Sequence, residues 1–182
     1  KEVMVQLYAY AGFPRSLNAL TVFREVLDKR EEQGIQDPVG KEASPLPPDL
    51  DRDEFGGKVR AQLSGRETDG PLAEWQRFAP VIDTFLKEHL FADIFARDIL
   101  SYQERELATI AALANMKGTE GQLRFHFGAA MNTGITEEEL NGFIATLRAT
   151  VSPDAAQSAQ SILTEVLESR TASAQKKTNQ AR

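Results

Sequence analysis

Apolar residues recur along this chain at intervals of three and four positions, which is the spacing of an amphipathic α-helix. The clearest run covers residues 101–147, where the pattern predicts three consecutive helices. No segment alternates convincingly with the period of a strand, so the predicted fold class is all-α. The residues expected on the buried faces of the three helices are Leu107, Ile110, Ala111 and Ala114, then Leu123, Phe127, Ala130 and Met131, then Leu140, Phe143, Ile144 and Leu147.

Each of these three helices has its own start signal. In a capping box, a hydroxyl accepts a hydrogen bond from a backbone N–H, and an acid or amide three positions later reaches back to the cap. Gly118 and Gly134 are expected to end the first two helices, because glycine adopts left-handed backbone angles without a Cβ clash. The capping-box spacing occurs at Ser101–Glu104, Thr119–Gln122 and Thr136–Glu139.

The pattern in the rest of the chain also predicts helical segments, which are separated by proline and glycine. Residues 1–10 fit a short strand and a helix about equally well, and we predict a helix because the neighbouring residues are helical. The other expected segments are a helix over 15–33, a proline-rich connector over 35–50, a charged helix over 51–63 interrupted by Gly56 and Gly57, a helix over 71–90 that Pro80 kinks or divides, a last helix that starts at Pro153 and is capped by Ser152, and a polar tail from Thr171 that frays or projects.

The amino-acid composition excludes several kinds of partner and of reactive site. The 182 residues are 41% hydrophobic with a net charge of −6, which argues against nucleic acid as a partner. No apolar run reaches membrane-spanning length, so no membrane is expected as a partner. There are no cysteines and two histidines, so thiol chemistry is excluded and we expect no metal and no cofactor.

The chain starts at Lys1 with no visible signal peptide. We therefore expect a cytoplasmic protein, or a periplasmic one if an upstream signal was removed.

Two residues in the central helices are the first candidates for catalysis. His126 sits at the edge of an apolar helix face, where a general acid or base and a histidine bonded within a helix–helix seam are both reasonable. Glu106 shares a helix edge with Ile110 and Leu113, so it need not be exposed. As a buried acid it could orient His126, and as a first-turn acid it would only favour the helix dipole.

Two further residues are candidates for substrate binding. Arg97 could bind a substrate carboxylate through two parallel hydrogen bonds, or it could pair with Asp93 or Asp98. Tyr10 could line a pocket or simply pack. The remaining polar candidates are expected to be structural: Arg105 and Arg124 on solvated faces, His89 as a structural residue, and Glu137, Glu138 and Glu139 as first-turn acids rather than metal ligands.

The stretch FADIFARDILSYQERELATIAALANMKGTEGQLRFHFGAAMNTGITEEEL resembles the core of the carboxymuconolactone decarboxylase family, an all-α superfamily that also contains alkyl hydroperoxidase D-like proteins. The peroxidase branch of that family uses Cys-x-x-Cys just before its histidine, whereas this chain has Thr119 and Gln122 there. The disulfide relay is therefore not available. The features that match are Arg97 to Leu100, Arg105 to Leu107, the His126 of HFGAAMNTGIT, and the GITEEE helix start.

The resemblance also implies a domain organisation. Residues 10–20, YAGFPRSLNAL, resemble the segment that follows the core in family members. A helix–break–proline–helix pattern that ends in Glu-Val-Leu occurs both in residues 1–29 and in residues 140–169. These observations imply the C-terminal half of a first copy at 1–34, a linker at 35–71, a second copy at 72–170 and a polar tail at 171–182. Family members of this kind resemble trimers or hexamers, so a homo-oligomer is expected.

Two functions follow from the residues and the resemblance together. The first is a cofactor-independent lyase of aromatic catabolism that decarboxylates a small carboxylated lactone, with His126 as acid/base, Glu106 as its partner, and Arg97 and Tyr10 at the substrate. The second is a non-catalytic structural or ligand-binding oligomer. They differ in one requirement, because an enzyme needs Glu106 and His126 to converge on a cleft that admits a small molecule.

Overall fold

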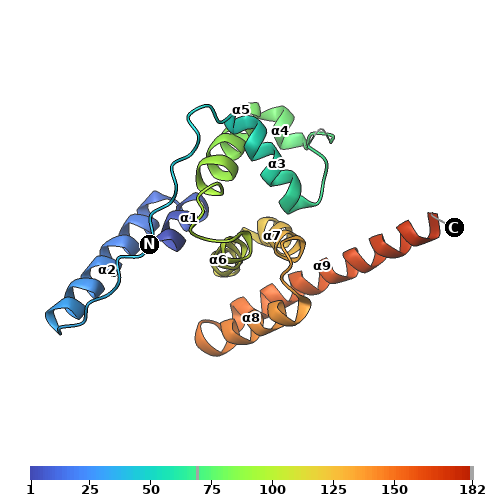
Figure 1. The fold of residues 1–182 in the computed structure, drawn as a ribbon. Helices are drawn as coiled ribbons and strands as arrows, with labels where there is room; N and C mark the ends of the chain where they lie inside the picture. The colour runs from blue at the N-terminus through green and yellow to red at the C-terminus, as the bar shows by residue number, and fades with distance from the viewer. Residues whose placement is uncertain (69, 181–182) are drawn as a thin grey trace.

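The computed structural model describes residues 1–68 and 70–180, and all the regular structure in that part of the chain is helical (Figure 1). The all-α prediction is confirmed. The elements are α1 (Glu2–Ala11), α2 (Phe13–Glu32), α3 (Arg52–Ser64), α4 (Glu74–Phe78), α5 (Pro80–Phe85), η1 (Leu86–Ile94), α6 (Tyr102–Ala114), α7 (Glu120–Asn132), α8 (Glu137–Thr150) and α9 (Pro153–Gln180).

Two of the three predicted capping boxes are present. The Ser101 and Thr136 hydroxyls each accept from the backbone N–H of the glutamate three positions on, at 3.2 Å in both cases. The prediction at Thr119 is wrong: its hydroxyl donates to the carbonyls of Leu113 and Met116, at 3.1 and 2.9 Å. Thr119 therefore stabilises the end of α6 instead of the start of α7.

The N-terminal third confirms the predicted helices and corrects the predicted linker. The connector is extended, but the expected break in the following helix is absent, since α3 runs continuously through Gly56 and Gly57. α3 buries Val59 and Leu63 against η1, so part of the range 35–71 is packed core rather than linker. Gly56 permits this packing because its backbone lies against the backbone of Lys87.

Residues 74–94 form one interrupted helical path. Pro80 divides it as predicted, since α4 ends at Phe78 and α5 begins at Pro80. α5 then continues into η1, which is a π-helix and was not predicted. η1 contributes Leu90, Phe91 and Ile94 to a core cluster shared with α3.

The second core cluster joins α6, α7, α8 and α9. Its centre consists of fully buried residues such as Phe127, Leu140 and Leu163. α9 remains helical to Gln180, so of the two alternatives for the tail from Thr171 it projects as regular helix and does not fray over the residues described. In Figure 1 the far ends of α2 and α9 project from opposite sides of the body. No described helix is long and apolar enough to cross a membrane.

The buried face of α6 differs from the predicted one. Leu107 is 38% exposed and Ala111 is also exposed, whereas Ile110 and Leu113 are buried as part of the core. The residues that α6 also buries are polar, namely Arg105, Glu106 and Thr109. They are buried because α1 lies alongside α6 and covers them.

Candidate functional site

The neighbouring helices α6 and α7 bring Glu106 and His126 together inside the protein. His126 Nδ1 lies 2.7 Å from Glu106 Oε2, and the two residues are 5% and 0% exposed. An ionised carboxylate can only accept hydrogen bonds, so with Glu106 in that form Nδ1 is the donor of this bond. Nε2 is then the ring nitrogen left to exchange a proton with another molecule.

Aromatic rings enclose the histidine. The Tyr10 ring from α1 packs edge-on against the imidazole, with ring centres 5.2 Å apart and an interplanar angle of 82°. Phe125 packs on it at 5.0 Å and 90°. These contacts and the burial of Glu106 place the pair in a region of low dielectric, where hydrogen bonds to charge are strong.

The hydroxyl of Tyr10 shares this environment. Burial, and then the negative charge of Glu106, raise the pKa of the Tyr10 phenol above its ordinary value. The hydroxyl therefore keeps its proton and remains a hydrogen-bond donor. The structure brings three of the four predicted site residues together: Tyr10, Glu106 and His126.

A polar seam holds α1 in place over this region. Glu2, Gln6 and Tyr10 are four residues apart, so they lie on one face of α1. Gln6 is fully buried, accepts from Arg105 Nη1 at 2.7 Å and donates to the Thr109 hydroxyl at 3.3 Å. This seam sets the position from which Tyr10 reaches His126.

Arg105 is the buried charge at the centre of the seam. It is 0% exposed, so the expectation of a solvated face is wrong. Its guanidinium also donates to the carbonyl of Arg97 at 2.7 Å, and its charged carbon lies 5.7 Å from the centre of the Phe95 ring. On α1, the four-residue spacing of Glu2, Gln6 and Tyr10 is a sequence pattern that could have indicated a polar face on this helix.

Arg97, the fourth predicted site residue, points to Glu2. Its Nε and Nη2 donate to the two oxygens of that carboxylate at 2.7 and 3.0 Å. The predicted pairing with Asp93 or Asp98 is wrong, because Asp93 bonds Arg52 and His89, and Asp98 bonds Ser44. Arg97 thus fastens α1 to the segment before α6, and its guanidinium is already occupied by an internal carboxylate.

The remaining polar candidates lie elsewhere. His89 is half-exposed and bonds Asp93 at 3.0 Å, and Arg124 pairs with Glu165 on the surface. Glu137, Glu138 and Glu139 occupy the first turn of α8. Within residues 1–68 and 70–180, no group of three or more histidine or carboxylate residues is arranged to hold a metal ion.

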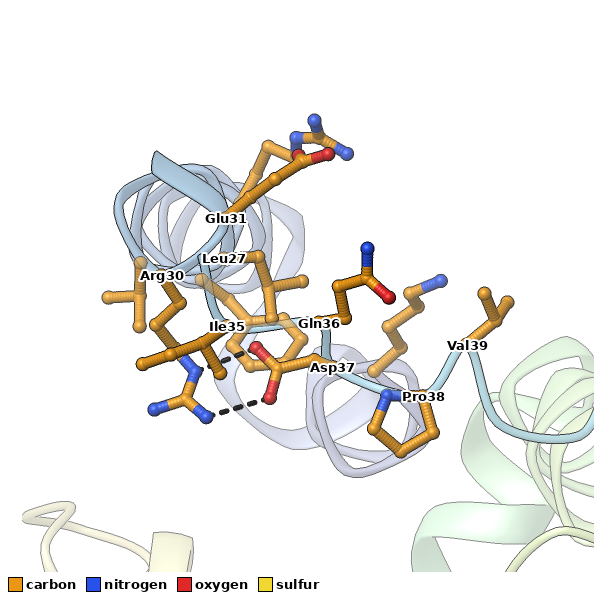
Figure 2. Close-up of a pocket in the computed structure, with 12 residues that line it drawn as sticks. Leu27, Arg30, Glu31, Ile35, Gln36, Asp37, Pro38 and Val39 are labelled. Atoms are coloured by element: carbon orange, nitrogen blue, oxygen red, sulfur yellow. Dashed lines mark hydrogen bonds and ion pairs between the residues drawn. The ribbon is translucent and has the colours of Figure 1, made fainter. Parts of the chain in front are cut away.

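Two surface hollows lie away from this pair. The larger, about 880 Å³, lies between α2 and residues 35–39, with Leu27 and Ile35 in its lining (Figure 2). Arg30 and Asp37 close one side through hydrogen bonds of 2.6 and 2.8 Å. The smaller, about 490 Å³, is lined by residues of α6, α8 and the loop between α7 and α8. Neither His126 nor Glu106 lines either hollow.

Comparison with known proteins gives a match in the same region. A family model described as "Carboxymuconolactone decarboxylase family" matches residues 80–165, which include both Glu106 and His126. The chain is also similar to a protein named 4-carboxymuconolactone decarboxylase from Acinetobacter baylyi (strain ATCC 33305 / BD413 / ADP1). The two are 30% identical over 97 residues, which is 53% of this chain and 72% of that relative.

Proposed function

Because this chain belongs to the carboxymuconolactone decarboxylase family, we propose that it is a cofactor-independent carboxy-lyase acting on a small carboxylated lactone. The observation that carries the proposal is the buried 2.7 Å contact between His126 and Glu106. A carboxylate that accepts a hydrogen bond from Nδ1 fixes the orientation of the imidazole and leaves Nε2 as the nitrogen that can meet a substrate. A protonated His126 is the acid that such a reaction needs.

In the proposed reaction, the bond between the lactone ring and its carboxylate carbon breaks and CO₂ leaves. The electron pair of that bond moves into the ring and onto the lactone carbonyl, which gives a dienolate. His126 donates its Nε2 proton to a dienolate carbon, and Glu106 holds the imidazole in position and stabilises its charge before the transfer. Water then restores the proton on His126, so the protein is unchanged after each turnover.

Access to the pair requires movement of α1. His126 is only 5% exposed and Tyr10 covers it, so a lactone reaches Nε2 when Tyr10 and the adjacent part of α1 shift away from α6, and α1 then closes over the bound ring. Arg97 acts in this proposal on the position of α1 through Glu2, and it binds a substrate carboxylate only when Glu2 releases it.

A second function, a non-catalytic structural or ligand-binding oligomer, is favoured by the same burial. The two hollows described above lie away from His126, as a protein that uses its surface for assembly or for another ligand would allow. The two functions differ in what happens to a lactone in the presence of the protein.

Replacement of His126 tests the proposed lyase function. We expect the wild-type protein to release CO₂ from 4-carboxymuconolactone, and we expect His126→Asn to lower kcat by at least about 10² because the proton donor is removed. His89→Asn is the matched control, since it removes the chain's other histidine from a half-exposed position and is expected to leave kcat within twofold. Turnover by His126→Asn at the wild-type rate would contradict the proposal, and no turnover by folded wild-type protein would favour the second function.

A further inference from the structure

Two buried polar atoms next to His126 have no hydrogen-bond partner within the part of the chain that the structure describes. They are the Tyr10 hydroxyl oxygen and Glu106 Oε1. Buried polar groups are nearly always paired, and each unpaired one costs about 1–3 kcal/mol. An unpaired donor and an unpaired acceptor beside one buried imidazole therefore indicate a position where another molecule supplies the missing partners.

We propose that Tyr10 is a catalytic residue of this site, whose hydroxyl donates a hydrogen bond to the lactone oxygen that becomes negatively charged as CO₂ leaves. The inference deepens the proposed lyase function and rests on it. It names the lactone carbonyl as the group that Tyr10 recognises, and it assigns Tyr10 the stabilisation of charge, whereas His126 has the transfer of the proton.

The geometry suits this role. The Tyr10 ring stands edge-on to the imidazole, with ring centres 5.2 Å apart, so α1 closing over a lactone bound at His126 brings the phenol beside that lactone. The Tyr10 proton stays on its oxygen throughout, because burial and the charge of Glu106 both oppose ionisation of the phenol. A neutral donor fixed in a dry site stabilises a developing oxyanion without the reorganisation that water would require.

The lactone oxygen needs a hydrogen-bond donor while it carries negative charge, and the groups around His126 differ in whether they can supply one. The pair released from the C–C bond resides on the lactone oxygen until a ring carbon takes the proton of His126. An ionised Glu106 can only accept hydrogen bonds, and Nη1 and Nη2 of Arg105 already donate to Gln6 and the Arg97 carbonyl, so Arg105 has only its Nε without a partner among the described residues. Of the three side chains described above as packing on or bonding to His126, namely Glu106, Phe125 and Tyr10, Tyr10 is the one that carries a hydroxyl hydrogen.

The same helix offers a matched control. Tyr8 also has a buried hydroxyl without a partner, but its ring stacks on Phe13 at 4.5 Å and lies 5.7 Å from His89. Tyr8→Phe and Tyr10→Phe therefore remove the same atom from the same helix, one away from His126 and one beside it. Neither hydroxyl has a hydrogen-bond partner of good geometry among the described residues, although Thr109 lies near that of Tyr10 and acts to lower the pKa of its phenol. Both variants are therefore expected to melt within about 3 °C of the wild type.

The first experiment measures kcat and KM of each variant with 4-carboxymuconolactone as substrate. We expect Tyr10→Phe to lower kcat by about 10²–10³ with KM within about threefold, because the bond is made mainly in the transition state. Tyr8→Phe is expected to keep wild-type kcat. Equal kcat values for the two variants would overturn the role of Tyr10, while the His126→Asn result would still decide the proposed function separately.

The second measurement does not depend on turnover. Tetronate is a planar five-membered lactone in its enolate form, so it mimics the charged ring that follows loss of CO₂. By calorimetric titration, we expect Tyr10→Phe to weaken tetronate binding at least about tenfold and Tyr8→Phe to leave it unchanged. If binding discriminates the two variants but wild-type protein does not decarboxylate, the oxyanion contact stands and the lyase function fails. If tetronate binds all three proteins equally or not at all, the inference is wrong.

Discussion

Glu2 connects the helix that carries Tyr10 to two arginines near α6. It accepts two hydrogen bonds from Arg97 at 2.7 and 3.0 Å and lies 3.4 Å from Arg105 Nη2. The hydrogen bonds from Arg97, followed by those from Arg105, hold the pKa of the Glu2 carboxyl below its ordinary value of 4.5, although partial burial acts in the opposite direction. Glu2 is therefore charged in the folded protein at pH values where a free glutamate begins to take up a proton.

This lowered pKa predicts a specific dependence of stability on pH. A carboxyl whose pKa is depressed by folding stabilises the protein above the unfolded pKa, and that contribution is lost as the pH falls through the folded pKa. We expect Glu2→Gln to lower the free energy of unfolding by about 1.5–3 kcal/mol at pH 7. The difference from the wild type should shrink steadily below about pH 4.5.

Urea unfolding between pH 3 and pH 7 measures this difference. Glu168→Gln is a suitable control, because Glu168 is exposed on α9, away from the seam, and its replacement should change little at any pH. A gap between wild type and Glu2→Gln that stays constant over the whole range would mean that the Glu2 charge does not hold α1 in place.

At the level of residues, sequence reasoning found the pair but not the groups that hold α1 above it. His126 and Glu106 could be selected because each lies at the edge of an apolar helix face. Arg105 could not, because its burial depends on a contact with Gln6, which is 99 positions away in the chain. A charged residue whose partner comes from such a distance has no local signature, and the pattern alone places it in solvent.

At the level of helices, too, features set by neighbouring residues could be predicted, whereas features set by distant parts of the chain could not. Prolines and two capping boxes marked helix starts correctly, because those signals act within one turn. The buried face of α6 was misassigned because the element that covers it, α1, buries polar residues there. The π-helix η1 gave no recognisable signal, since its apolar residues fit α-helical spacing about as well.

Packing of α3 on η1 gives a prediction at this scale. A Cβ at Gly56 would overlap the carbonyl oxygen of Lys87, whereas a Cβ at Gly57 would meet no atom within 4 Å. Gly56→Ala must separate two packed helices, so we expect it to lower the free energy of unfolding by about 3 kcal/mol or more. Gly57→Ala should raise it by about 0.5–1 kcal/mol, because alanine is the better residue in a helix interior.

The two alanine variants form a matched pair, since they differ by one position in one helix. Thermal and denaturant unfolding of both proteins would measure the two effects against the wild type. Similar destabilisation by both would show that the helix tolerates alanine poorly for a reason other than contact with Lys87, and no change from Gly56→Ala would contradict the close approach of α3 and η1.

For the whole molecule, the expectation of a homo-oligomer remains a prediction, and α4–α5 offer the surface for it. This surface, which we call the α4–α5 patch, gathers large exposed apolar side chains over a short stretch. Its most exposed member, Phe78, has 89% of its surface open to solvent. Monomers rarely leave so many large apolar residues exposed together. The patch consists of Leu72, Trp75, Phe78, Val81, Ile82 and Phe85.

We propose that the α4–α5 patch packs against the same patch of a second copy of this chain. Glu74 and Arg77 lie among its apolar residues, and Arg77 also donates to the Leu72 carbonyl, so the stretch carries one charge of each sign that a two-fold arrangement can set against its opposite. This self-complementarity matters because each copy carries a net charge of −6, and an interface dominated by acidic residues would repel its partner. Burial of several aromatic side chains would supply most of the binding energy.

Replacement of one residue at the centre of the patch tests this assembly. Phe78→Glu places two like charges in the proposed interface, so we expect the dissociation constant of the oligomer to rise at least about tenfold. Sedimentation or light scattering over a range of protein concentrations would measure it. Val151→Glu is the control, because Val151 is 63% exposed at the corner between α8 and α9, outside the patch. Equal weakening by both variants would place the interface elsewhere, and a wild-type protein that is monomeric at every concentration would contradict the assembly itself.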